Sequence, residues 1–165
     1  MSIHTALVKT EGQKISLENA KKFIYSGDHG AESIFVGRVR NENSGKKVTA
    51  VTYDAHDQAV IKSFQLICNE ARNKFDNNAK IFLEHAKGYA PVGEISILIA
   101  VGSGHRDEAF KICRYILEEV KHQSPIWKKE HYLDGKEEWL PGHSLRPKQE
   151  TKSVSYTHLT LPTKA

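Results

Sequence analysis

The sequence predicts an α+β domain, in which strands and helices mix without the strict strand–helix–strand rhythm of a dinucleotide-binding fold. The chain has 165 residues, of which 39% are hydrophobic and 27% charged, as in an ordinary globular domain with one core. The nearly all-apolar run ISILIAV at 95–101 favours a central strand buried on both faces. Two long stretches, 57–75 and 106–122, follow the helical period. We therefore expect one main mixed sheet, helices against it and a smaller hairpin element.

The amino-terminal part predicts a strand followed by a short helix. Residues 3–8 alternate apolar and polar side chains, as a half-buried strand does. Ser16 is a good N-cap for a helix over 17–26, and Gly27 is a stop signal at its end.

A strand–loop–strand pattern comes next. Residues 31–40 and 47–53 have strand character, and the loop 41–45 (NENSG) between them is polar. This spacing predicts that the two strands pair as a hairpin with a polar tip.

The helix predicted over 57–75 has one apolar face, made by Val60, Phe64, Ile67, Cys68 and Ala71. Because Cys68 lies within this face, we expect a core thiol rather than a reactive one. Strands are predicted over 80–87 and 94–101, joined by the connection GYAPVG.

The second long helix, 106–122, has a predicted inner stripe of Phe110, Cys113, Leu117 and Val120, so Cys113 is again expected in the core. Pro125 disfavours helical angles at Ser124 and ends this helix.

The last predicted elements form a hairpin. Residues 126–132 have strand character, 133–136 (LDGK) form a turn, and 137–140 are the partner strand.

Residues 1–150 are the predicted folded domain, and 151–165 are predicted to be a disordered or artefactual tail. The segment SVSYTHLTLPTKA at 153–165 has neither a helical period nor a core face.

Composition excludes several classes of protein. No apolar run approaches the length of about 18 residues that a membrane span requires, and the start of the chain lacks a signal-peptide pattern, so we expect a cytoplasmic protein. Two cysteines are too few for a disulfide scaffold, and no metal-binding motif or cofactor motif is present. The net charge of +4, half of it from Lys152 and Lys164, does not by itself indicate nucleic-acid binding.

The first of three basic clusters is Gly37-Arg38-Val39-Arg40, at the end of a predicted strand. The period of two places Arg38 and Arg40 on the same side, and Gly37 allows close approach of a ligand or backbone. The alternative is a solvated edge strand carrying two charges.

The second cluster, Gly102-Ser103-Gly104-His105-Arg106, leads from a buried strand into a helix. Free backbone N–H groups and the helix dipole favour an anion there, and an arginine binds phosphate through two hydrogen bonds. Asp107 and Glu108 also complement the dipole, so a plain helix cap is the alternative.

The third cluster is KHQSPIWKKE at 121–130. Alternation along the predicted strand sends Lys128 and Lys129 to opposite faces and puts Glu130 on the side of Lys128, where it could orient that lysine. Lys121 lies on the last helical turn, where lysines commonly just complement the dipole. Together the three clusters favour a pocket for an anionic small molecule.

The order of these motifs resembles the large subunit of molybdopterin synthase, the MoaE family. The resemblance spans residues 3 to 140 and includes, besides those clusters, VTAVTYD at 48–54, EAR at 70–72, HAKG at 85–88 and VGEISILIAV at 92–101. The stretches HR-x-x-AF and K-x-x-x-P-I-W-K-K-E are the most specific parts of it.

The resemblance implies an α/β hammerhead fold with an additional small antiparallel β subdomain. It also implies a sulfurtransferase of molybdenum cofactor biosynthesis, which inserts two sulfurs into cyclic pyranopterin monophosphate to form the molybdopterin dithiolene. The sulfur arrives as a thiocarboxylate on the carboxyl-terminal Gly-Gly of a small ubiquitin-like partner. Large subunits pair as a homodimer within a heterotetramer.

The resemblance further implies roles for matched residues. Lys121 and Lys128 correspond to the catalytic lysines, and Lys121 lies beside the thiocarboxylate. Residues matched to substrate binding are Arg38, Val39, Arg40, His105, Arg106, Lys121, Lys128, Lys129 and Glu130. The His105–Arg106 pair is matched to the phosphate site, contributed across the dimer.

Two other readings remain open at this point. A nucleotide- or nucleic-acid-binding module without turnover predicts exposed aromatic side chains among basic ones on a sheet face, and Trp127 is its one candidate. A scaffold subunit would use the same clusters only to dock a partner.

Overall fold

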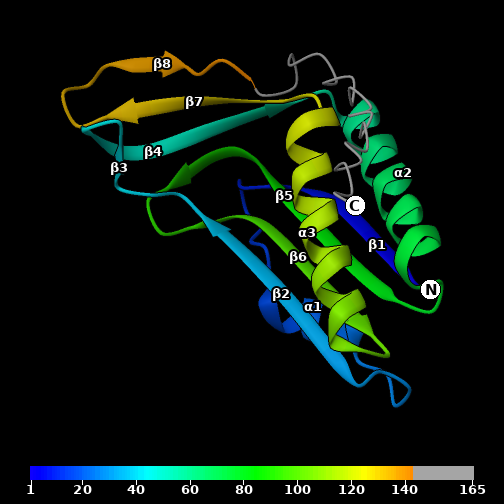
Figure 1. Ribbon diagram of the computed structural model, residues 1–165. Helices are drawn as coiled ribbons and strands as arrows, with labels where there is room; N and C mark the ends of the chain where they lie inside the picture. The colour runs from blue at the N-terminus through cyan, green and yellow to red at the C-terminus, as the bar shows by residue number, and fades with distance from the viewer. Residues whose placement is uncertain (143–165) are drawn as a thin grey trace, which may run out of the picture.

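A computed structural model describes residues 1–142 and contains three helices and eight strands (Figure 1). The predicted boundary at 150 and the tail 151–165 lie outside the described residues. The α+β class is confirmed. None of the helices described is long and apolar enough to cross a membrane.

The strands form one mixed sheet in the order β2-β6-β5-β4-β7-β8, with β1 beside β5 and β3 beside β4. Among the strands of residues 1–142, only β1 and β5 pair in parallel. The strand bounds are β1 Ile3–Lys9, β2 Ala31–Arg38, β3 Glu42–Asn43, β4 Lys46–Ala55, β5 Lys80–Pro91, β6 Ile95–Ser103, β7 Ile126–Tyr132 and β8 Glu137–Trp139.

The three helices lie on the two faces of the main sheet. Helices α2 (Asp57–Phe75) and α3 (Arg106–Gln123) cover one face, and α1 (Leu17–Ile24) lies against the other (Figure 1). Strands β3, β4, β7 and β8 extend beyond the helices as an antiparallel β subdomain.

Strand alternation explains how one sheet supplies two cores. Along β6, Ile97, Ile99 and Val101 pack under α2 and α3, whereas Leu98 and Ala100 pack on the α1 side. Strand β6 lies between β2 and β5, and helices cover it on both sides of the sheet, so it is buried on both faces, as its sequence predicts.

The helix predictions are largely confirmed. Helix α2 has the predicted bounds and the predicted buried face, and Ser16 caps α1 by accepting a hydrogen bond from the Asn19 N–H at 3.2 Å. Helix α1 ends at Ile24, two residues before the predicted end.

The predicted place of Phe110 in the inner stripe of α3 is wrong, because its side chain is 64% exposed. The buried face of α3 is made by Ala109, Ile112, Cys113, Ile116, Leu117 and Val120. With about 100° of rotation per residue, Phe110 lies roughly 90° from the centre of that face.

The predicted hairpin between 31–40 and 47–53 is also wrong. Strand β2 pairs along its length with β6, whereas β4 pairs with β3, β5 and β7. The register shifts between Gly37 and Arg38, where β2 ends. The only hairpin in this region is the short one between β3 and β4, whose turn residues Ser44 and Gly45 both have positive φ.

Strand β5 does not end at Lys87 as predicted but continues to Pro91, through most of the predicted connection. Its first part pairs with β6 and its last part, Gly88–Pro91, pairs with β4. Gly88 has a φ of 111°, and a Cβ there would lie 2.5 Å from Thr10 Oγ1. A glycine at this point therefore lets β5 join the main sheet to the β subdomain.

Candidate functional site

The arginine segment, residues 38–40, begins at the last residue of β2 and contacts the β5–β6 turn. The Arg38 guanidinium donates a 2.7 Å hydrogen bond to the Gly93 carbonyl. Val39 is buried and exchanges backbone hydrogen bonds with the turn, to Glu94 O at 3.0 Å and from Gly93 N at 2.9 Å. Arg40 is exposed. Because β2 ends at Arg38, the strand alternation that predicted a shared side for Arg38 and Arg40 does not extend to Arg40.

Val39 therefore holds the segment through its side chain and its backbone. It packs with Val48, Val51 and Ala90 in a small core of the β subdomain. Since Val51 lies opposite Glu130 in the β4–β7 ladder, this core anchors the arginine segment close to the strand that carries Lys128 and Glu130.

The predicted alternation along β7 is confirmed by its side-chain contacts. Lys128 Nζ lies 3.7 Å from Glu130 Oε1 on one face. On the other face Lys129 Nζ lies 2.9 Å from Glu137 Oε2 and 5.5 Å from the centre of the Trp139 ring. Lys129 is therefore paired away from Lys128 and Glu130.

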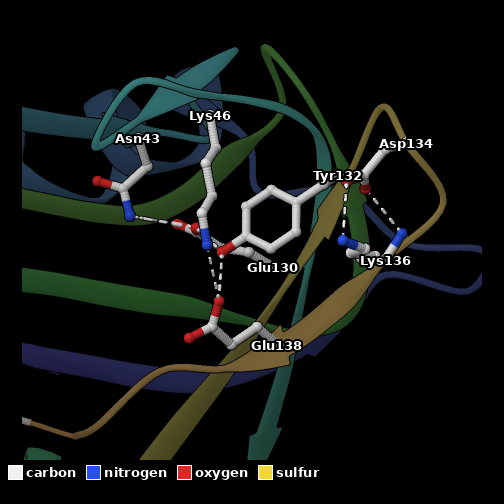
Figure 2. A network of polar contacts seen from close by, with 7 residues as sticks. All are labelled: Asn43, Lys46, Glu130, Tyr132, Asp134, Lys136 and Glu138. Atoms are coloured by element: carbon white, nitrogen blue, oxygen red, sulfur yellow. Dashed lines mark hydrogen bonds and ion pairs between the residues drawn. The ribbon is translucent and has the colours of Figure 1, made fainter.

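Glu130 is buried, with 3% of its surface exposed, and it is the centre of a polar network (Figure 2). Asn43 Nδ2 lies 2.9 Å from Oε1 and 3.1 Å from Oε2 of this carboxylate. The Tyr132 hydroxyl lies 3.0 Å from Glu130 Oε2 and 3.3 Å from Glu138 Oε2. Lys46 Nζ lies 3.2 Å from the same Glu138 oxygen.

Partial burial and the neighbouring Glu130 and Glu138 carboxylates raise the pKa of Tyr132 to about 12. The phenol is therefore protonated at neutral pH and has a hydrogen to donate to a carboxylate. Opposite Lys128 on β4 lies Tyr53, whose pKa is raised mainly by burial. Both phenols, Tyr132 on β7 and Tyr53 on the neighbouring β4, are thus neutral groups.

Lys121 lies on the last turn of α3 and is exposed. The helix ends at Gln123, and Ser124 has the extended conformation that Pro125 favours. The Ser124 hydroxyl lies 2.9 Å from the Ser63 hydroxyl, so the turn is tied to α2. Lys121 and Lys128 therefore flank one anchored turn.

His105 and Arg106 lie at the opposite end of α3. Fifteen residues separate Arg106 from Lys121, which corresponds to about 22 Å along the helix axis. His105 occupies the N-cap position but makes no side-chain capping bond, and both residues are exposed. A single chain therefore does not bring this pair to Lys121.

A cavity of about 640 Å³, lined in part by His29 and His105, carries three acidic side chains and one lysine. Lys80 lines it together with Asp28, Asp76 and Glu108. Burial raises the pKa of Asp76, but hydrogen bonds from the Ser103 hydroxyl and two backbone N–H groups outweigh burial and hold this pKa below its usual value. The charged Asp76 carboxylate accepts a hydrogen bond from the Gly104 N–H, just before α3, and so offsets the positive end of the α3 dipole.

The polar network around Glu130 was only partly visible in the sequence. The shared side of Lys128 and Glu130 follows from alternation, and Tyr132 continues the same face. Asn43 belongs to another segment, 87 residues away from Glu130, and no periodic pattern relates the two. The one local signal in the sequence was the Ser44-Gly45 pair, which adopts the positive φ values of a tight hairpin turn and so places Asn43 at the end of a strand.

Exposed aromatic side chains on the β subdomain and the adjoining end of β5 are more numerous than predicted. Trp127, Tyr89 and Trp139 are 43%, 53% and 53% exposed, so Trp127 is not the one candidate. Lys129, the cation next to Trp139, is neutralised by Glu137. This pairing weighs against a phosphate-binding sheet face.

Comparisons with known proteins agree on one family. The family described as MoaE protein matches residues 10–123. A molybdopterin synthase catalytic subunit of Synechococcus elongatus is 43% identical over 131 residues, which are 79% of each chain.

Solved structures give the same result. Molybdopterin synthase from Staphylococcus aureus superposes with a TM-score of 0.75 and 28% identity, over 86% of this chain and 98% of the other. A protein–protein complex of subunits 1 and 2 of the Helicobacter pylori molybdopterin-converting factor matches with a TM-score of 0.66 and 19% identity, over 84% and 90%, and supports the fold alone. With its matched residues, its fold and its curated relatives in agreement, the chain belongs to the MoaE family.

Proposed function

We propose that this chain is the catalytic subunit of a molybdopterin synthase. It transfers two sulfurs from the carboxyl-terminal thiocarboxylate of a small ubiquitin-like partner to cyclic pyranopterin monophosphate and so forms the molybdopterin dithiolene. Family membership and the 43% identity to a curated catalytic subunit support this activity. The observation that carries the proposal is the contact between Asn43 and Glu130, which brings the segment after FVGRVR to the KKE segment across 87 residues of sequence.

The β subdomain supplies the groups that this reaction requires. Arg40 is exposed next to a buried anchor, Val39, and offers a cation to the anionic precursor. The Lys128 side chain is 41% exposed beside the buried Glu130 carboxylate. Lys128 can therefore reach a substrate while its ammonium stays 3.7 Å from Glu130 Oε1, and in this proposal it assists proton transfer at the pterin carbons.

Lys121 serves the other reactant. A thiocarboxylate is an anion, so an exposed ammonium at the turn before β7 attracts the incoming tail and neutralises its charge. In this proposal Lys121 also stabilises the tetrahedral species formed on attack at the thiocarboxylate carbon. Its role is electrostatic and involves no covalent bond to the lysine.

The site is completed by a second copy of the chain. Because His105 and Arg106 lie about 22 Å along α3 from Lys121, they serve the phosphate of a precursor held by the partner protomer. We therefore include in the proposal a homodimer with one small subunit bound to each protomer. The Helicobacter pylori protein that shares this fold was itself solved as a complex of two converting-factor subunits, and the proposed partner corresponds to such a second subunit. The two free, buried cysteines fit a reducing compartment, so we place the protein in the cytoplasm.

The experiment mixes the protein with a thiocarboxylated small partner and cyclic pyranopterin monophosphate. Molybdopterin is followed as its fluorescent oxidation product. Formation of product excludes both the non-catalytic binding module and the scaffold. Absence of product with a folded, partner-bound protein would contradict the proposed function.

Lys121→Ala tests the assigned electrostatic role. We expect a loss of about 10²–10³ in kcat, the range measured when one oxyanion-stabilising group is removed. Lys22→Ala on α1 is the matched control, because Lys22 is an exposed lysine on the opposite face of the sheet. A Lys121→Ala protein that folds, binds its partner and converts the precursor at full rate would refute the role.

A further inference from the structure

Glu130 is the one aspartate or glutamate that is buried among the residues described. A buried carboxylate is tolerated only where donors replace its lost hydration. Tyr132, two residues further along β7, donates on one side. The remaining donor, Asn43, faces both oxygens and comes from β3, which does not pair with β7.

Asn43 is held in place by its own hairpin. Ser44 and Gly45 have φ values of 49° and 76°, as in the tight turns that match the twist of a two-stranded ribbon. The turn puts Asn43 opposite Lys46, which extends to Glu138 on β8 and lies 5.0 Å from the centre of the Tyr132 ring. The hairpin is thus attached to both β7 and β8 (Figure 2).

The same hairpin begins directly after the arginine segment. The Asn41 carbonyl accepts a 3.0 Å hydrogen bond from the Val48 N–H, and Arg40 precedes it. The backbone at Arg40 and the Lys128 ammonium are therefore linked through three residues of chain, the Asn43 amide and the Glu130 carboxylate. Neither Lys128 nor Arg40 contacts Asn43 among the hydrogen bonds and ion pairs described.

We propose that Asn43 is a positioning residue for the sulfur-transfer reaction: it fixes the Glu130 carboxylate, which in turn sets the place of the Lys128 ammonium relative to the arginine segment. The inference rests on the proposed function. A carboxylate that loses Asn43 retains Tyr132 and can rotate away from its present plane. Lys128, at 3.7 Å from Oε1, then loses the group that orients it.

The test compares Asn43→Ala with the wild-type protein in the molybdopterin assay, together with the affinity for the small partner. We expect kcat to fall at least about tenfold, because misplacing a reacting group by about 1 Å can cost 10²-fold. The KM for the precursor and the affinity for the partner should change less than about threefold. The matched control is Asn69→Ala on α2, which likewise removes a donating side-chain amide, but one whose acceptor is the Gln65 carbonyl. This variant should leave kcat unchanged.

A double variant separates positioning from a general structural effect. If Asn43 acts through Glu130, Asn43→Ala should lower kcat little further in a Glu130→Gln background. Asn43→Ser, which keeps a donor, should recover part of the loss and serves as the test if the alanine variant does not fold. A wild-type kcat in Asn43→Ala, or losses that multiply fully in the double variant, would overturn the inference. Wild-type turnover tests the proposed function separately, so the two failures are distinguishable.

Discussion

His85 predicts a specific dependence of stability on pH. The side chain is 8% exposed on β5, Nδ1 lies 2.8 Å from the Ala86 carbonyl, and the ring meets Tyr53 edge-on at 5.0 Å. Burial lowers its pKa from 6.5 to about 4. Between these values the unfolded chain binds a proton that the folded chain excludes, so stability falls as pH decreases from about 6.5 towards 4. The pKa difference of about 2.5 corresponds to about 3 kcal/mol.

The measurement is urea unfolding, followed by circular dichroism at pH 7 and pH 4.5, of the wild-type protein and His85→Asn. Asparagine keeps a donor and does not titrate. The wild-type protein should lose about 2–3 kcal/mol more than the variant between the two pH values. The carboxyls of Asp57, Asp76 and Glu137, whose pKa values are lowered in the fold, titrate alike in both proteins and cancel in the difference. Equal pH dependence of the two proteins would refute the reasoning.

Two further predictions concern packing. Gly37→Ala should lower the free energy of unfolding by about 1–3 kcal/mol, because the added Cβ would lie 2.5 Å from Ile97 Cγ2 and the packed core must shift; an unchanged urea midpoint would show that the core yields without strain. Ile67→Ala on α2 should cost about 2–5 kcal/mol because Ile67 is 1% exposed. Leu66→Ala, at a neighbouring position that is 55% exposed, should cost about 0.5 kcal/mol; similar melting temperatures for these two variants would contradict the assigned faces.

Local sequence patterns correctly predicted those helices and strands whose apolar period or flanking turn residues are unambiguous. The bounds and buried face of 57–75 follow from an unbroken apolar stripe. The strand 126–132 follows from Pro125 before it and the LDGK turn after it. Alternation along that strand was enough to place Glu130 beside Lys128 and to send Lys129 to the other face. These are contacts between residues close in sequence, whose geometry the backbone period fixes.

Pairings between distant segments were not predictable in this way. The strand pattern of residues 31–38 does not say which strand they pair with. The prediction paired them with the next strand along the chain, 47–53, beyond the polar loop. The structure instead pairs β2 with β6, about 60 residues later, because a buried strand such as β6 needs a partner strand along each edge to satisfy its backbone N–H and C=O groups. The contact between Asn43 and Glu130 was not predictable for the same reason, because the two residues are distant in sequence.

The sequence by itself determined the α+β class, the apolar face of α2, part of the apolar face of α3 and the motifs that resemble the MoaE family. Those features depend on residue type and short-range spacing, which a linear pattern contains. Only the tertiary structure decided that the arginine segment meets β7 through Asn43, and that α3 separates His105 and Arg106 from Lys121 by most of its length. Such distances depend on which strands pair and on the rigid length of a helix, so they exist only in the folded chain.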